Sequence, residues 1–149
     1  MTNATETLPS AKDFMKRISL AEAQKASEES RKRKAEEDEK TALIEQMLKP
    51  SELSDDEAIR RAVAIIERAT NNGLTEVQVY RFPNQLCTDR GRAINQQEPG
   101  WERTLTGLPK QIYALWAKHF RERGYKLRVQ IIDFPNGMPG DVGMTLSWS

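Results

Sequence analysis

Residues 126–148 read KLRVQIIDFPNGMPGDVGMTLSW, and this stretch decides the fold. Apolar residues alternate with polar or small ones on both sides of a centre rich in Pro, Gly and Asn, which favours two strands joined by a turn. The predicted strands cover residues 126–134 and 141–148 and pair as an antiparallel hairpin. The clean alternation also predicts that only one face of the sheet is covered by the rest of the chain.

Two helices with clear end signals precede the hairpin. Ser54 and Glu57 fit a capping box, in which the serine oxygen and the glutamate carboxylate bind free amides at a helix start. Asn71-Asn72-Gly73 then favours a left-handed helix end. A second helix is predicted over residues 108–123, with an apolar face that includes Trp116 and with Gly124 after its last turn.

A third strand is predicted over residues 74–82, where Val77 and Val79 face inward and Gln78, Tyr80 and Phe82 face outward. The element order is therefore α-α-β-α-β-β. The crossover helix after the first strand permits a right-handed parallel pairing, so the place of that strand in the sheet stays open. The expected fold is α+β: a charged N-terminal helical arm, then two helices packed on a mixed or antiparallel three-stranded sheet.

Composition divides the chain near residue 50. Nine of the ten aromatic residues and all eight glycines lie at or beyond Gly73. We expect a disordered N-terminus over residues 1–12 and a charged helical arm over residues 13–50. A compact domain should then cover residues 51–149 and contain a long loop at residues 83–106. Long loops in compact domains often carry function.

The arm is nearly free of apolar residues between positions 27 and 41. Opposite charges recur there four residues apart, as in Glu28–Lys32, and each such pair stabilises an isolated helix by roughly 0.2–0.5 kcal/mol. Short apolar patches lie at both ends of the arm, around Phe14 and around Leu43. Because apolar positions are not sustained over several heptads, a long coiled coil is not expected.

The overall composition excludes several classes of protein. The chain has 23 basic and 22 acidic residues. This balance does not demand a nucleic-acid partner. One cysteine cannot form an internal disulfide framework or a cysteine-rich zinc site. No signal-peptide core and no long apolar run occur, so we expect a cytoplasmic protein without a membrane partner.

Cys87 lies in the sequence CTDRGR, next to Asp89, Arg90 and Arg92. Neighbouring arginines can lower a thiol pKa and favour the nucleophilic thiolate. The spacing does not fit a phosphate-cradling cysteine loop, which requires Arg where this chain has Ala93. A buried or unreactive loop thiol is the simpler interpretation.

Two other features have simple structural interpretations. His119 is the only histidine and lies within a predicted helix, where a packing role is commoner than catalysis. Asp133 and Asp141 flank the PNGMPG turn and together suggest a cation, but they lack the dense ligand set of a calcium loop. No catalytic residue, metal ligand or cofactor is therefore predicted.

The outward face of the predicted sheet mixes aromatic and basic side chains, an arrangement that can stack nucleobases. Our leading hypothesis is nevertheless a non-enzymatic interaction or accessory protein that binds another protein through the arm, the long loop or the open sheet face. A nucleic-acid-binding protein is the alternative, and a cysteine-dependent enzyme is the third. The predicted binding residues are Tyr80, Arg81, Phe82, Cys87, Asp89, Arg90, Arg92 and Arg128.

Overall fold

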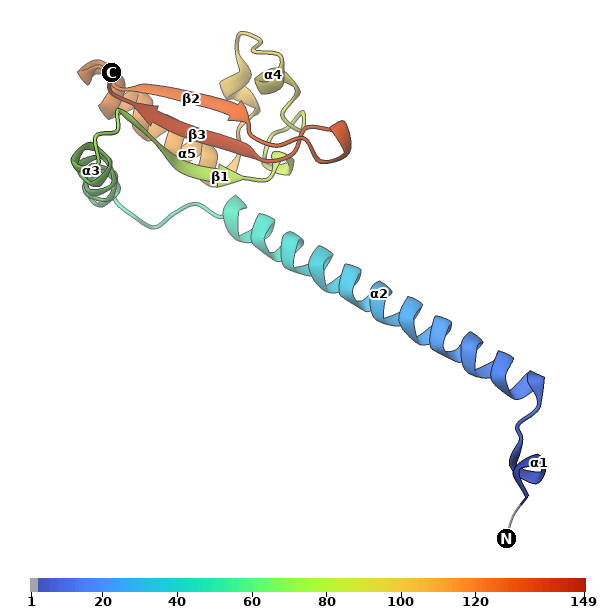
Figure 1. Ribbon diagram of the computed structural model, residues 1–149. Coiled ribbons are helices and arrows are strands. Elements are labelled where there is room, and N and C mark those ends of the chain that lie inside the picture. Colours follow the sequence, from blue (N-terminus) through green and yellow to red (C-terminus); the bar gives the residue numbers. More distant parts are fainter. Residues whose placement is uncertain (1–2) are drawn as a thin grey trace. The chain divides into compact units, whose positions relative to one another are not determined.

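The computed structural model describes residues 3–149. Its contacts divide the chain into two units, Met1–Ala42 and Leu43–Ser149. The fold is α+β, as predicted, with helices and one three-stranded sheet (Figure 1). All three strands belong to the second unit, which therefore contains the candidate sites discussed below.

The sheet consists of β1 (Glu76–Phe82), β2 (Lys126–Ile131) and β3 (Val142–Ser147). Its order is β1-β3-β2, and both neighbours pair with β3 in the antiparallel direction. The predicted hairpin of β2 and β3 is confirmed, and β1 lies on the other side of β3 (Figure 1). The central strand is buried from Val142 to Leu146, because it has a neighbour on each side.

Strand β1 contains a β-bulge at which Val79 is the extra residue. Beyond the bulge, Tyr80 pairs with Met144 and Phe82 pairs with Val142, so both aromatic side chains face the core. Phe82 is only 1% exposed. The prediction that Tyr80 and Phe82 face outward is wrong, because one extra residue reverses the alternation of every later side chain.

Helix α3 (Asp55–Asn71) has the ends that the sequence predicts. The Ser54 hydroxyl accepts a hydrogen bond of 3.2 Å from the Glu57 amide. After the last turn, Gly73 adopts a φ of +78°, a conformation that favours glycine. Ile66 and Ala69 are the buried residues of this helix, and its other apolar side chains are at least partly exposed.

Helix α5 (Gly107–Leu115) continues without a gap into a π-helical turn, η3 (Trp116–Phe120), and a 3-10 turn, η4 (Arg121–Arg123). Gly124, with a φ of +91°, ends this run at the predicted position. The predicted helix is thus present, but it is not a uniform α-helix. Phe120 in η3 packs with Ile66 of α3 and Leu146 of β3, so both helices cover the same face of the sheet.

The segment 83–106 is folded as a series of short turns. It contains η1 (Asn84–Leu86), α4 (Arg92–Asn95) and η2 (Trp101–Thr104). Several of its side chains belong to the larger core cluster, together with residues of all three strands; they are Leu86, Cys87, Ile94 and Leu105. The predicted long loop therefore lacks long elements but forms an integral part of the core.

The first unit is helical and exposed. It contains the one-turn helix α1 (Ala4–Thr7) and most of α2 (Ala11–Leu48), and neither helix has a buried residue. The predicted charge pairs of the arm, such as Glu28–Lys32, are absent from the ion pairs among residues 3–149. The disorder predicted for residues 1–12 stays a prediction.

The last residues of α2, Leu43–Leu48, belong to the second unit. Ile44 and Met47 pack against the larger core cluster. A Cβ atom on Gly107 would lie 2.8 Å from the Cα of Leu48, so the start of α5 meets the end of α2 too closely for any side chain at position 107. In residues 3–149, none of the helices has the length and apolar content to cross a membrane.

Candidate functional site

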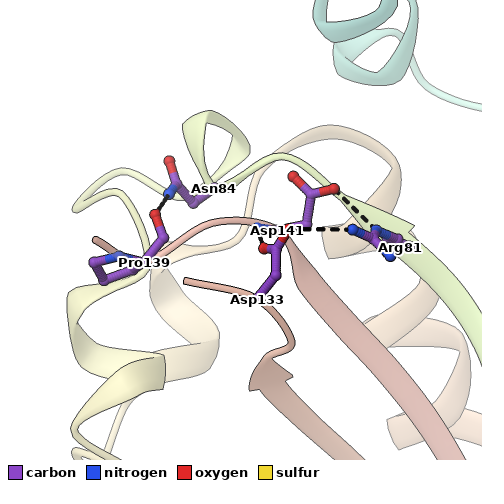
Figure 2. A network of polar contacts seen from close by, with 5 residues as sticks. All are labelled: Arg81, Asn84, Asp133, Pro139 and Asp141. Atoms are coloured by element: carbon purple, nitrogen blue, oxygen red, sulfur yellow. Dashed lines mark hydrogen bonds and ion pairs between the residues drawn. The ribbon is translucent and has the colours of Figure 1, made fainter. Parts of the chain in front are cut away.

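Arg81 is the centre of a polar network at the end of β1 (Figure 2). Its Nε donates to Asp141 Oδ2 at 2.9 Å, and its Nη2 donates to Asp133 Oδ2 at 3.3 Å. Asp133 Oδ1 also accepts a 2.6 Å hydrogen bond from the Asp141 amide, and Asn84 donates to the Pro139 carbonyl at 2.7 Å. The network therefore fastens the β2–β3 connection, which contains the turn η5 (Pro135–Gly137), to the end of β1.

This arrangement explains the two aspartates that flank the turn. Both carboxylates point toward Arg81, whose single positive charge offsets one of their two negative charges (Figure 2). The Arg81 side chain is 51% exposed, so these ion pairs contribute little stability despite their good geometry. Arg81 therefore accounts for the orientation of both aspartate side chains beside the turn.

Cys87 is buried, with 3% of its surface exposed. Burial and, to a smaller extent, the nearby Asp89 carboxylate together raise the pKa of its thiol to about 11, against the opposing effect of a hydrogen bond with Thr104. The expectation that Arg90 and Arg92 lower this pKa is wrong, because the desolvation of the thiolate dominates. At neutral pH the thiol stays protonated and is a poor nucleophile.

The other charged residues of this segment have local structural roles. Asp89 accepts hydrogen bonds from the amides of Gly91 at 3.0 Å and Ala93 at 2.9 Å, and so holds the start of α4. Arg92 lies 3.5 Å from Glu98 and is 64% exposed. Arg90 is exposed and has a φ of +57°, which is unusual for a residue with a side chain. The two arginines remain accessible to a partner.

The open face of the sheet is polar. Gln78, Arg128 and Gln130 are exposed on it, and Arg128 forms a 2.9 Å ion pair with Glu76. Of the eight predicted binding residues, only Arg81 and Arg128 belong to this face. Tyr80 and Phe82 lie on the opposite side, and the rest belong to the segment 83–106. The structure therefore does not bring the eight residues together in one site.

A different feature, absent from the sequence predictions, is a groove on the core side of the sheet, which we call the α3/α5 groove. Its walls are α3 with the preceding segment and α5 with η3, and its floor is the sheet. It consists of two adjoining hollows of about 360 Å³ and about 460 Å³. Both hollows are lined by Leu53, Ala58, Ile112 and Leu115.

The smaller hollow of the groove is lined by apolar side chains apart from Arg61. Ala62 and Ile65 of α3 face Trp116 and Phe120 of η3, and Val79, Leu127 and Leu146 form the floor. Leu53 and Ile65 remain 41% and 38% exposed. Apolar side chains in such a concave site stay accessible to solvent although a continuous core lies directly below them.

The larger hollow of the groove has a polar mouth. Asp55, at the first turn of α3, lies 2.9 Å from His119 Nε2 and 3.4 Å from Lys118 Nζ. The hydrogen bonds from His119 and then Lys118 lower the pKa of the Asp55 carboxyl. These contacts join α3 to η3 at one end of the groove. A helix dipole also favours an acidic side chain at the start of α3.

One signal in the sequence points to the groove. Leu53 precedes α3, and Ile65 lies on α3 outside its apolar stripe. Residues 53–69 thus contain more apolar side chains than the single apolar face of a helix that packs on the sheet. The spacing between α3 and α5 is a tertiary property, and the sequence alone does not determine it.

No family model matches this chain, and no curated protein or solved structure resembles it closely enough to indicate a family.

Proposed function

We propose that this chain is a non-enzymatic interaction protein whose second unit binds a helical segment of a protein partner in the α3/α5 groove. The observation that carries this proposal is the apolar hollow between α3 and η3, where Leu53 and Ile65 stay more than one-third exposed. An amphipathic helix can lay its apolar face into a groove of this kind, with anchors three and four residues apart.

The chemistry of the predicted site residues supports binding rather than catalysis. Cys87 is buried and protonated, and His119 is engaged with Asp55. The α3/α5 groove offers apolar surface with few polar groups, an arrangement suited to recognition. Aromatic residues such as Trp116 are common anchors at interfaces between proteins.

The nucleic-acid alternative has weaker support. It relied on aromatic side chains beside arginines on the open sheet face, whereas Tyr80 and Phe82 lie on the core side and Arg128 is paired with Glu76. A mobility shift with a single-stranded oligonucleotide at two salt concentrations tests it directly, because phosphate contacts make binding fall steeply with salt.

The groove itself is tested with a library of amphipathic helical peptides displayed on phage and selected against the full chain. The affinity of each selected peptide is then measured by fluorescence anisotropy. Ala58→Trp fills the groove, and Leu53→Lys places a charge in it. Ala64→Trp is the matched control, because Ala64 is exposed on α3 and does not line the groove.

We expect both groove variants to weaken peptide binding by about tenfold or more, and the control to leave it unchanged. Circular dichroism and denaturation midpoints show that each variant is folded. Peptides that bind all variants equally, or a selection that yields no amphipathic helix, would contradict the proposal.

A further inference from the structure

We infer that two copies of this chain pair through α2 as an antiparallel dimer. The contact lies on one side of the helix, which we call the α2 face, and it does not involve the α3/α5 groove. It is carried by three observations: the exposure of α2, the lack of ion-pair partners for its charges, and the order of those charges along the helix.

Helix α2 is exposed along its length. None of its 38 residues is buried, and Phe14 and Ile18 near its start are 46% and 51% exposed. In proteins, most helical stability comes from the packing of one helix face against other parts of the structure. A second copy that covers one face of α2 would supply this packing.

The charged side chains of α2 have no partners within the part of the chain that the structure describes. Residues 22–40 are all exposed and mostly charged. No ion pair among residues 3–149 includes a side chain of α2. These charges are therefore available to a second molecule, and complementary charges can set the orientation of two partners.

The α2 face has apolar ends and a charged middle. Positions eleven residues apart lie on nearly the same side of an α-helix, because eleven residues complete about three turns. The face that this spacing defines consists, in chain order, of Phe14, Ile18, Glu22, Lys25, Glu29, Arg33, Glu37, Lys40, Ile44 and Leu48.

The charges on this face are complementary to those of an antiparallel copy. When both helices are centred at Arg31, acids face bases throughout the middle, in the pairs Glu22–Lys40, Lys25–Glu37 and Glu29–Arg33. Each pair occurs twice, because the two-fold axis of the dimer repeats it. Arg31 itself lies on the opposite side of the helix, so the two copies of Arg31 do not meet.

The same register brings the apolar ends of the two helices together. Phe14 lies opposite Leu48, and Ile18 lies opposite Ile44. Leu48 is 46% exposed, and Ile44 is only partly buried although it packs against the core of its own chain. Contact with a second copy would remove this apolar surface from water.

Other arrangements of the two helices place like charges together. In a parallel dimer each residue meets its own copy, so Glu22 lies beside Glu22. An antiparallel shift of eleven residues keeps the same face but places Glu22 opposite Glu29, or in the other direction Arg33 opposite Lys40. Since like charges at an interface are unfavourable, the antiparallel register centred at Arg31 is preferred.

Sedimentation equilibrium of the full chain over a concentration series tests the inference. One variant reverses two acids of the α2 face, Glu22→Lys with Glu29→Lys. The other reverses the two bases that face them, Arg33→Glu with Lys40→Glu. We expect a dimer for the unmodified chain and dimerisation at least about tenfold weaker for each variant, because each then opposes like charges.

The matched control is Glu28→Lys with Asp38→Lys. It changes the net charge as much as the acid reversal does, but at exposed positions outside the α2 face. We expect it to dimerise like the unmodified chain. Circular dichroism shows whether α2 stays helical in each variant.

A mixture of the two reversed variants restores opposite charges at every pair of the α2 face. We expect the mixture to dimerise about as tightly as the unmodified chain. Mixing does not change either chain, so this recovery cannot come from a more stable α2 in the single chain. A mixture that stays as weakly associated as its components would overturn the inference.

Two further outcomes would also overturn it. The first is a chain that is monomeric at every concentration. The second is a pair of reversed variants that dimerise as tightly as the unmodified chain, as a parallel dimer would, since like residues meet in it before and after reversal. Neither outcome affects the proposed function, because peptide binding in the α3/α5 groove is measured separately. Ala58→Trp, which fills the groove, should leave the dimer intact.

Discussion

The indole Nε1 of Trp116 donates a 3.0 Å hydrogen bond to the backbone carbonyl of Tyr125. Trp116 lies in the π-helical turn η3, and Tyr125 immediately precedes β2. The Arg121 guanidinium also lies 4.5 Å from the centre of the Trp116 ring. One side chain thus ties the helix that forms a wall of the α3/α5 groove to the strand that forms part of its floor.

Replacing Trp116 with alanine should therefore destabilise the second unit. The side chain is half-buried, so we expect a loss of about 2–4 kcal/mol in the free energy of unfolding. Trp116→Phe keeps most of the apolar contact and loses the hydrogen bond, which should cost about 1 kcal/mol. Urea denaturation of both variants measures the difference. An unchanged midpoint for Trp116→Ala would mean that the side chain does not pack on the sheet.

Cys87 should make stability depend on pH in the alkaline range. Its pKa is about 11 in the folded state against an ordinary value of 9.0, so the folded state holds the proton more tightly. The protonated thiol therefore adds about 2–3 kcal/mol to the free energy of unfolding below pH 9. This added stability is lost as the pH rises from 9 towards 11. The unfolding free energy of the reduced protein should thus fall more steeply than that of Cys87→Ala. Equal slopes would show that the thiolate is not desolvated.

Arg90 and Arg92 should contribute little to folding. Both are exposed, and the single ion pair of Arg92 joins it to Glu98 at the surface. Replacing both with alanine should change the unfolding free energy by less than about 1 kcal/mol. Thermal and urea denaturation test this. A loss above about 2 kcal/mol would assign these residues a structural role and remove them as binding candidates.

Arg81→Ala should loosen the β2–β3 connection without unfolding the sheet. The carboxylates of Asp133 and Asp141 would lose the guanidinium that both of them contact at the end of β1. We expect faster amide hydrogen exchange in residues 133–141 and a stability loss of about 1 kcal/mol or less. Exchange that stays as slow as in the unmodified protein would show that the turn holds its conformation alone.

Truncation locates the N-terminal limit of the folded second unit. A chain that begins at Leu43 keeps Ile44 and Met47, which pack against the core, whereas one that begins at Leu53 loses both. We expect full stability for the first. For the second, we expect unfolding to stay cooperative but the free energy of unfolding to fall by about 2–4 kcal/mol, because two partly buried apolar side chains are removed. Equal stability would place the limit after these residues, near the predicted boundary at residue 51.

The sequence predicts elements whose signals are local. The alternation around β2 and β3, the capping at Ser54 and the stops at Gly73 and Gly124 all depend on neighbouring residues, and each is confirmed. The bulge at Val79 was missed because the extra residue is an ordinary strand former, without the glycine that often marks such sites. One missed residue was enough to place Tyr80 and Phe82 on the wrong face.

The candidate site was harder to predict than the fold. The segment 83–106 contains no regular periodicity, because its buried side chains, such as Leu86 and Ile94, project from short turns. The burial of these side chains therefore cannot be predicted from hydrophobic periodicity in the sequence. The groove depends on how far apart α3 and α5 settle on the sheet, and this distance follows from packing across residues far apart in the chain.

The strand order β1-β3-β2 has a consequence for synthesis of the protein on the ribosome. Both outer strands are translated before the central strand that pairs with them. Their backbone amides and carbonyls therefore have no strand partner until Val142–Ser147 has left the ribosome. A nascent chain that stops short of this strand has two unpaired strands and an open core. Such intermediates are prone to aggregation, so chaperones that cover exposed strands during translation should raise the yield of folded protein.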